Sequence, residues 1–129
     1  MKPSVRGAIV WLALLCTAAN VLANQVPELS LEKKARLSDL VAIGRVESTR
    51  LEKVGAGEQY EYARVHVDRV LKGKPPDQLD VMFRGMVAEF DPVCCVVGKF
   101  YLFFLVKQRR STSFESVNGP FGIYPISGQ

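Results

Sequence analysis

A run of seven consecutive apolar residues near the C-terminus constrains the fold of this chain more than any other feature. Residues 100–106 (FYLFFLV) put bulky side chains on both faces of an extended strand, because successive side chains of a strand point to opposite sides. A strand of this kind must be covered on both faces. We therefore expect residues 99–107 to form the central strand of the domain.

Several other segments have the composition of strands. Together with the central run, the predicted strands are residues 40–47, 59–71, 79–84 and 99–107, and the last strand-like pieces are residues 114–117 and 122–126 around a turn. Gly44 predicts a bulge or a tight bend within the first of them. The consecutive apolar residues Val70 and Leu71 interrupt the alternation of the second strand and predict another bulge there.

One short helix is predicted before the strands. Ser30 can cap a helix over residues 31–39, and Leu31, Ala35 and Leu37 would then face inward. This helix is the only predicted element that could cover an outer face of the central strand. Helices and strands do not alternate, so we expect an all-β fold with one short helix, either a small, closed, five-stranded antiparallel barrel or a β-sandwich.

Residues 1–23 have the parts of a secretory signal peptide. Lys2 and Arg6 supply the positive start, and residues 7–16 (GAIVWLALLC) supply the apolar segment. Small or branched residues stand at the −3 and −1 positions of a cut before Asn24. We therefore expect a periplasmic or secreted protein.

The sequence disfavours two alternatives to a cleaved signal peptide. An uncleaved anchor is disfavoured because Thr17 and Asn20 interrupt the apolar run below the roughly 20 residues that span a bilayer. Cys16 does not indicate a lipoprotein, because the cleavage site of a lipoprotein requires a small residue where Leu15 stands. No stable membrane insertion is expected after cleavage.

Removal of 23 residues from 129 leaves 106, so residues 24–129 form one domain with a core that does not depend on disulfides. The signal peptide contains two of the 17 basic residues and no acidic residue, which leaves 15 basic against 13 acidic residues. A net charge this small does not indicate a nucleic-acid partner.

The two cysteines of the mature chain, Cys94 and Cys95, are adjacent and cannot join distant segments of one chain. Three states stay open in an oxidising compartment: a vicinal disulfide, a bridge to another chain, or two buried thiols. A redox-active pair usually has two residues between its cysteines, and this pair has none.

The order of motifs resembles that of exported bacterial domains grouped as TIMP-like or netrin-like. The resemblance rests on DLVAIGRV at residues 39–46, RVHVDRVLKG at 64–73 and GKFYLFFL at 98–105, with a cysteine before the last motif. These motifs are similar to the family pattern ADLVVVGxV…VxxVLKG…C…GxxYLVFL. The resemblance spans residues 39 to about 124 and implies a five-stranded, OB-like barrel, but it implies no reaction.

Two departures limit what the resemblance implies about activity. Animal inhibitors of the superfamily chelate the zinc of a protease through an N-terminal cysteine, whereas the predicted mature N-terminus here is Asn24. The similar bacterial domains tend to pair the cysteine before the YLVFL strand with one near the C-terminus, and no cysteine follows Cys95. Metalloprotease inhibition therefore rests on analogy of fold.

No combination of residues identifies a reaction, so we expect no enzyme, no metal and no cofactor. His66, the only histidine, lies near Arg64 and Asp68 on the polar side of its strand, but the sequence ties no Ser or Cys nucleophile to it. Cys94 and Cys95 lack the spacing of a metal site. The chain contains no phosphate-binding glycine loop and no HExxH motif.

The function expected is that of an exported, non-enzymatic module that binds or inhibits an unknown protein partner in the cell envelope or outside the cell. Its binding face would be the irregular residues 85–95 or the N-terminal segment, because long loops on a rigid scaffold commonly carry binding. The alternative is a polyanion or glycan binder with a basic rim, formed by Lys72, Lys74, Lys107, Arg109 and Arg110.

Overall fold

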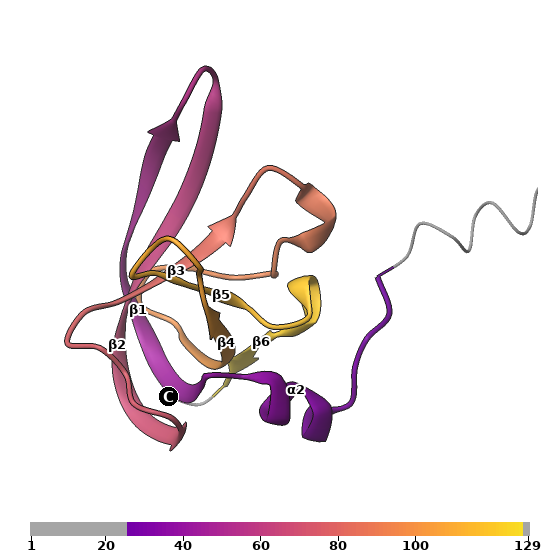
Figure 1. Ribbon diagram of the computed structural model, residues 1–129. Helices are drawn as coiled ribbons and strands as arrows, with labels where there is room; N and C mark the ends of the chain where they lie inside the picture. Colours follow the sequence, from indigo (N-terminus) through magenta and orange to yellow (C-terminus); the bar gives the residue numbers. More distant parts are fainter. Residues whose placement is uncertain (1–25, 128–129) are drawn as a thin grey trace, which may run out of the picture.

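The computed structural model describes residues 26–127, and the predicted signal peptide, residues 1–23 with Cys16, lies outside the described residues. The described residues form one helix, six strands and two short 3-10 turns (Figure 1). The elements are α2 (Leu31–Leu37), β1 (Leu40–Val54), β2 (Glu58–Lys72), β3 (Leu79–Arg84), η1 (Ala88–Phe90), β4 (Phe100–Lys107), β5 (Phe114–Ser116), η2 (Gly119–Phe121) and β6 (Ile123–Ile126). Within this part of the chain, no helix is long and apolar enough to cross a membrane.

The six strands belong to one sheet, and five of them close into a ring. The ring runs β1-β2-β3-β5-β4, and β4 closes it by pairing with β1. β6 stands outside the ring and pairs with residues 100–103 of β4, on the edge that β5 occupies further along that strand. The predicted mostly-β fold with one short helix is confirmed, and the ring fits both a barrel-like and a sandwich description.

Two details of the strand pairing go beyond the prediction. The described residues contain six strands, of which five form the ring, and β5 and β6 are separate strands that both pair with β4. β3 and β5 are parallel, with Val81 opposite Phe114. A closed ring with an odd number of strands cannot be antiparallel at every pairing, so one parallel pair is a geometric requirement of this closure.

The register between β1 and β2 shows both predicted bulges. It shifts between Ile43 and Gly44, and it shifts again where Leu71 is the extra residue. A Cβ atom on Gly44 would lie 2.6 Å from Val65 Cγ1 and 2.8 Å from the carbonyl oxygen of His66. Glycine is therefore needed at position 44, and the bulges let these long strands bend around the core.

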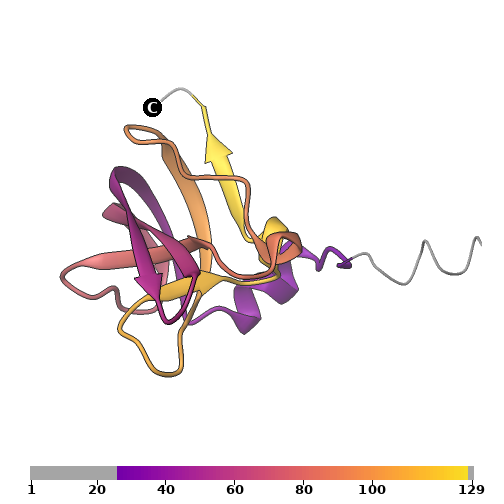
Figure 2. The same cartoon turned by 90° about the horizontal axis from the view of Figure 1, so that it is seen from above.

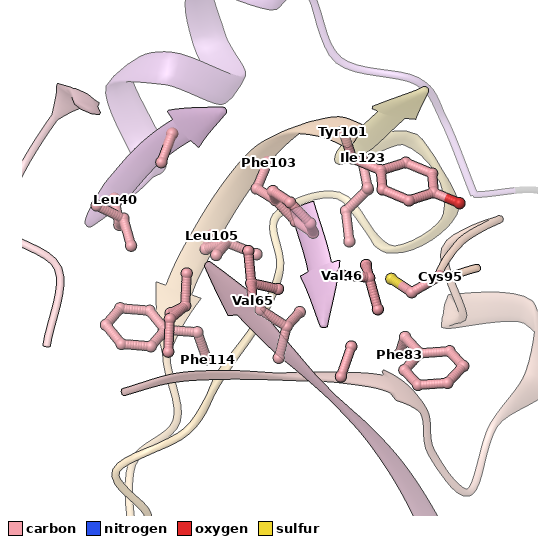
Figure 3. Close-up of a cluster of buried hydrophobic side chains, with 14 residues drawn as sticks. Leu40, Val46, Val65, Phe83, Cys95, Tyr101, Phe103, Leu105, Phe114 and Ile123 are labelled. Carbon is pink, nitrogen blue, oxygen red and sulfur yellow. The ribbon is translucent and has the colours of Figure 1, made fainter. Parts of the chain in front are cut away.

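β4 is the central strand, as predicted, because β1 pairs with one of its edges and β5 and β6 pair with the other. Its side chains Tyr101, Phe103 and Leu105 point into the main core (Figure 3). On the outer face, Phe104 is 5% exposed and packs with Val117, and Ala35 of α2 and other half-buried residues complete this second cluster. Each bulky side chain buried in this way contributes about 1.5–3 kcal/mol.

The helix α2 follows its predicted cap at Ser30, whose side chain accepts a hydrogen bond from the first turn. The predicted inward face is wrong at two positions, because Leu31 and Leu37 are 60% and 50% exposed. The buried side chain is Lys34, which is 1% exposed and donates a hydrogen bond to the Tyr124 hydroxyl. Apolar periodicity treats lysine as a surface residue, although its long stem can cover apolar surface when the ammonium finds a partner.

Candidate functional site

The connection between β3 and β4, residues 85–99, carries an unusual share of the exposed apolar side chains. Twelve large apolar residues are exposed in the described part of the chain, and six of them lie between positions 86 and 97. These six are Met86, Val87, Phe90, Val93, Val96 and Val97. Val93 is the most exposed, at 83%. Exposed apolar side chains gathered on one segment make this connection a candidate interaction surface.

The backbone of this β3–β4 connection is held in place along its length. The amide of Gly85 donates to Asp91 Oδ1 at 2.9 Å, and the amide of Val96 donates to the Tyr101 hydroxyl at 2.9 Å. Between these points, Cys95 is 7% exposed and belongs to the main core (Figure 3). The exposed apolar side chains therefore stand on a backbone that a partner does not have to order, which lowers the entropic cost of binding.

A cavity of about 380 Å³ opens beside the first half of the β3–β4 connection. Its apolar and aromatic lining includes Tyr60 of β2, Met82 of β3, and Met86 and Phe90 of the connection. Its charged lining residues are Asp91 and Glu115, which are both acidic. The cavity is assembled from segments that are far apart in the sequence.

The turns η1 and η2 lie side by side in both views (Figures 1 and 2). Phe90 of η1 and Gly119 of η2 both line the cavity. Gly119 of η2 has a φ of 55°, and a Cβ atom there would lie 3.2 Å from Phe90 Cα. Glycine therefore allows the backbone of η2 to approach η1 closely. This contact sets the position of Phe90 at the cavity.

The structure joins Cys94 and Cys95 by a disulfide, and the peptide bond between them is cis. Of the three states that the sequence leaves open, the vicinal disulfide is the one found here. Cys95 lies in the main core and Cys94 packs against it. The pair therefore anchors the β3–β4 connection to the core in the middle of its exposed apolar residues.

The structure brings two of the five predicted rim residues to one cavity. Lys74 and Lys107 line a cavity of about 600 Å³ between the β2–β3 connection and the β4–β5 connection. Lys72 instead donates hydrogen bonds of 2.9 and 3.1 Å to carbonyl oxygens near the C-terminus of α2. Lys72 therefore has a structural partner in α2, because the C-terminal carbonyls of a helix attract cations. Arg109 and Arg110 are exposed in the turn after β4.

His66 lies on the exposed side of β2 beside a carboxylate of β1. Its Nδ1 is 3.6 Å from Glu47 Oε1, and the two side chains are 61% and 43% exposed. Both residues line a cavity of about 320 Å³ whose lining contains no Ser, Thr or Cys. Within residues 26–127, no group of three or more His, Cys, Asp and Glu residues could hold a metal ion.

A cluster of charged residues joins the first three strands, and the sequence analysis did not identify it. Arg64 donates to both carboxylate oxygens of Asp80 at 2.9 and 3.2 Å, and Arg50 Nη1 lies 3.2 Å from Asp80 Oδ1. The guanidinium of Arg50 also lies 4.7 Å from the ring centre of Tyr62. Arg64 and Asp80 are opposite each other in the β2–β3 register. Their opposite charges would predict an ion pair only once that register is known.

This cluster shifts the pKa values of its members. Burial by itself raises the pKa of Asp80, but the hydrogen bond from Arg64 and the charge of Arg50 together hold that pKa below its usual value. The hydrogen bond to Asp80 raises the pKa of Arg64. Burial, followed by the charge of Glu52, raises the pKa of the Tyr62 hydroxyl.

The sequence predicted a binding face at residues 85–95 or in the N-terminal segment, and it did not predict the cavity beside the β3–β4 connection. The apolar residues at positions 86–97 follow neither the period of a strand nor that of a helix. This pattern indicates that they do not form the buried face of a strand or a helix. Tyr60 and Glu115 carry no such signal, because only the folded sheet brings them to the cavity. Compared with known proteins, this chain matches no family model and no curated protein.

Proposed function

We propose that this chain is an exported, non-enzymatic protein-interaction module that binds its partner through the β3–β4 connection. The observation that carries the proposal is the gathering of six exposed apolar side chains on residues 86–97. Each Å² of apolar surface that a partner removes from water contributes about 25 cal/mol. The fixed backbone of the connection makes this surface available without a large loss of conformational entropy.

We also propose that the module is of the TIMP-like or netrin-like kind. Support comes from the motifs at residues 39–46, 64–73 and 98–105, and from the ring of five strands, which suits the OB-like barrel that the resemblance implies. An inhibitor-like module with Asn24 at its N-terminus has no thiol to offer to a metal there. Its action would consist of covering a surface of the partner with the β3–β4 connection.

The test replaces exposed apolar side chains of the connection in the tagged mature protein. Wild-type protein and the double variant Phe90→Ser/Val93→Ser are incubated with an envelope fraction, and the retained proteins are identified by mass spectrometry. We expect the double variant to lose the proteins that the wild type retains, while its melting temperature stays unchanged because both side chains are exposed.

The matched control is the double variant Leu31→Ser/Leu71→Ser, which removes side chains of 60% and 51% exposure on α2 and β2. This control should retain the same proteins as the wild type. The proposal is wrong if the wild type retains nothing above background, or if the two double variants lose the same proteins to the same extent.

A second candidate function is binding of a polyanion or an acidic glycan at the basic rim. The observation that favours it is that Lys74 and Lys107 line one cavity together with Thr112 and Pro75. Retention on a heparin matrix should then fall with rising salt. Retention should also fall for Lys74→Glu/Lys107→Glu, and if neither this variant nor Arg109→Glu/Arg110→Glu alters it, the rim binds no polyanion.

A further inference from the structure

We propose that the cavity beside the β3–β4 connection receives the side chain of an arginine or lysine from the protein partner. This inference rests on the proposed function, because it names the chemistry of the partner segment that the connection binds. The partner segment would place this basic residue in the cavity and apolar neighbours over the exposed side chains of the connection.

The lining of the cavity matches the two parts of a basic side chain. The rings of Tyr60 and Phe90 and the thioethers of Met82 and Met86 provide apolar and polarisable surface for an aliphatic stem. Aromatic ring faces also attract a guanidinium or an ammonium group. A volume of about 380 Å³ lies within the range of sites that hold small molecules, so it accommodates one long side chain.

The charges at the cavity favour a cation. Asp91 and Glu115 are its charged lining residues, and within residues 26–127 neither forms an ion pair with a lysine or an arginine. The hydrogen bond from the Gly85 amide holds the carboxylate of Asp91 in position. Arg84, the residue before the connection, lies 3.3 Å from Glu61 and is engaged there. The negative charge is therefore left for a partner to neutralise.

An apolar partner side chain fits this cavity less well than a basic one. It would cover the rings and the thioethers, but it would also remove the carboxylates of Asp91 and Glu115 from water without a positively charged partner. A charge-assisted hydrogen bond from a guanidinium or an ammonium avoids this cost. The surrounding apolar residues Met86, Phe90 and Val93 then favour apolar neighbours on both sides of the basic residue.

The test uses two synthetic peptides, acetyl-Leu-Val-Arg-Val-Leu-amide and the same peptide with citrulline in place of arginine. Citrulline keeps the shape of arginine and removes its charge. Binding is followed through the methyl NMR signals of Met82 and Met86. We expect the arginine peptide to shift both signals and to bind about tenfold more tightly than the citrulline peptide, as one charge-assisted contact implies.

The variant Glu115→Gln removes one carboxylate of the cavity. Glu89→Gln is the matched control, because Glu89 lies in the β3–β4 connection but does not line the cavity. We expect Glu115→Gln to weaken the arginine peptide about tenfold and Glu89→Gln to change it by less than about twofold. Equal binding of the two peptides, no binding of either, or no effect of Glu115→Gln overturns the inference. The proposed function is tested separately, by protein capture with the wild type and the two double variants, so the inference can fail while the proposed function holds.

Discussion

Lys34 holds two elements of this fold together with a single side chain. It comes from α2, and its Nζ donates to the hydroxyl of Tyr124 on β6 while lying 4.9 Å from the centre of the Tyr124 ring and 4.0 Å from Glu28 Oε1. A lysine is rarely buried to this extent unless its charge has partners. Here the hydroxyl, the ring face and the carboxylate together replace the water that the ammonium loses.

Removing the Lys34 side chain should weaken the docking of α2. We expect Lys34→Ala to lower the free energy of unfolding by about 2–4 kcal/mol, because it leaves a cavity and removes the donor to Tyr124. Lys34→Met keeps the volume and should cost about 1–2 kcal/mol. Urea denaturation measures both variants. The control Lys33→Ala, at an exposed neighbouring position, should stay within about 0.5 kcal/mol of the wild type, and an equal loss for Lys33→Ala and Lys34→Ala would contradict the assignment.

The adjacent cysteines lead to a second prediction at this scale. Replacing Cys94 and Cys95 by serine should cost about 1–3 kcal/mol, because Cys95 is buried in the core and two hydroxyls take the place of sulfur. The oligomeric state should not change, and correctly exported wild-type protein should run as a monomer on gels with and without a thiol. A dimer that disappears on reduction would show that these cysteines join two chains instead.

At the scale of elements, the β1–β2 hairpin extends well beyond the rest of the sheet (Figure 1). The charged cluster lies where this hairpin meets β3, with Arg50 from β1, Arg64 from β2 and Asp80 from β3. Two arginines on one carboxylate, which is 17% exposed, fix the orientation of the hairpin relative to the ring. We therefore expect this cluster to restrain the orientation of the hairpin more strongly than an isolated surface ion pair would.

The lowered pKa of Asp80 predicts how stability depends on pH. The folded chain binds this proton more weakly than the unfolded chain, so the contribution of Asp80 to stability is fully present above the unfolded pKa, at about 4, and is lost as the pH falls through the folded value. Asp80→Asn should cost about 1–2 kcal/mol at pH 7. The difference from the wild type should shrink below about pH 4, as measured by thermal unfolding across pH. A difference that stays constant down to the lowest pH would rule out an electrostatic contribution from Asp80.

At the scale of the whole molecule, the proposed export depends on residues 1–23, and it predicts a defined mature N-terminus. In a bacterium with a periplasm, we expect mass spectrometry of the exported protein to show Asn24 as its first residue. Ala23→Ser keeps a small residue before the cut and should leave processing intact, whereas Ala23→Arg should block it. Full-length wild-type protein recovered from the membrane fraction would support the anchor alternative instead.

The local patterns located every strand, but they did not predict residues 48–54 of β1 or the inward face of the helix. The predicted strand at residues 59–71 and its bulge at Leu71 agree with β2, because alternation and its interruption are properties of neighbouring residues. The inward face of α2 could not be predicted from local patterns. Lys34 is buried because Tyr124 supplies a partner for its ammonium, and Tyr124 lies 90 positions away in the sequence. The same limit applies to the cavity, where Tyr60 and Glu115 meet through strand pairing.

The sequence by itself determined where the strands of this protein lie, apart from the second half of β1, that residues 99–107 are central, and that an irregular connection precedes them, because these properties depend on runs of neighbouring side chains. Only the tertiary structure decided that one pair of strands is parallel and that the connection keeps six apolar side chains exposed. It also decided that an acidic cavity forms beside them. The physical reason is that a ring of strands closes through contacts between residues that are distant in sequence. This closure determines which side chains are buried in the core and which stay exposed.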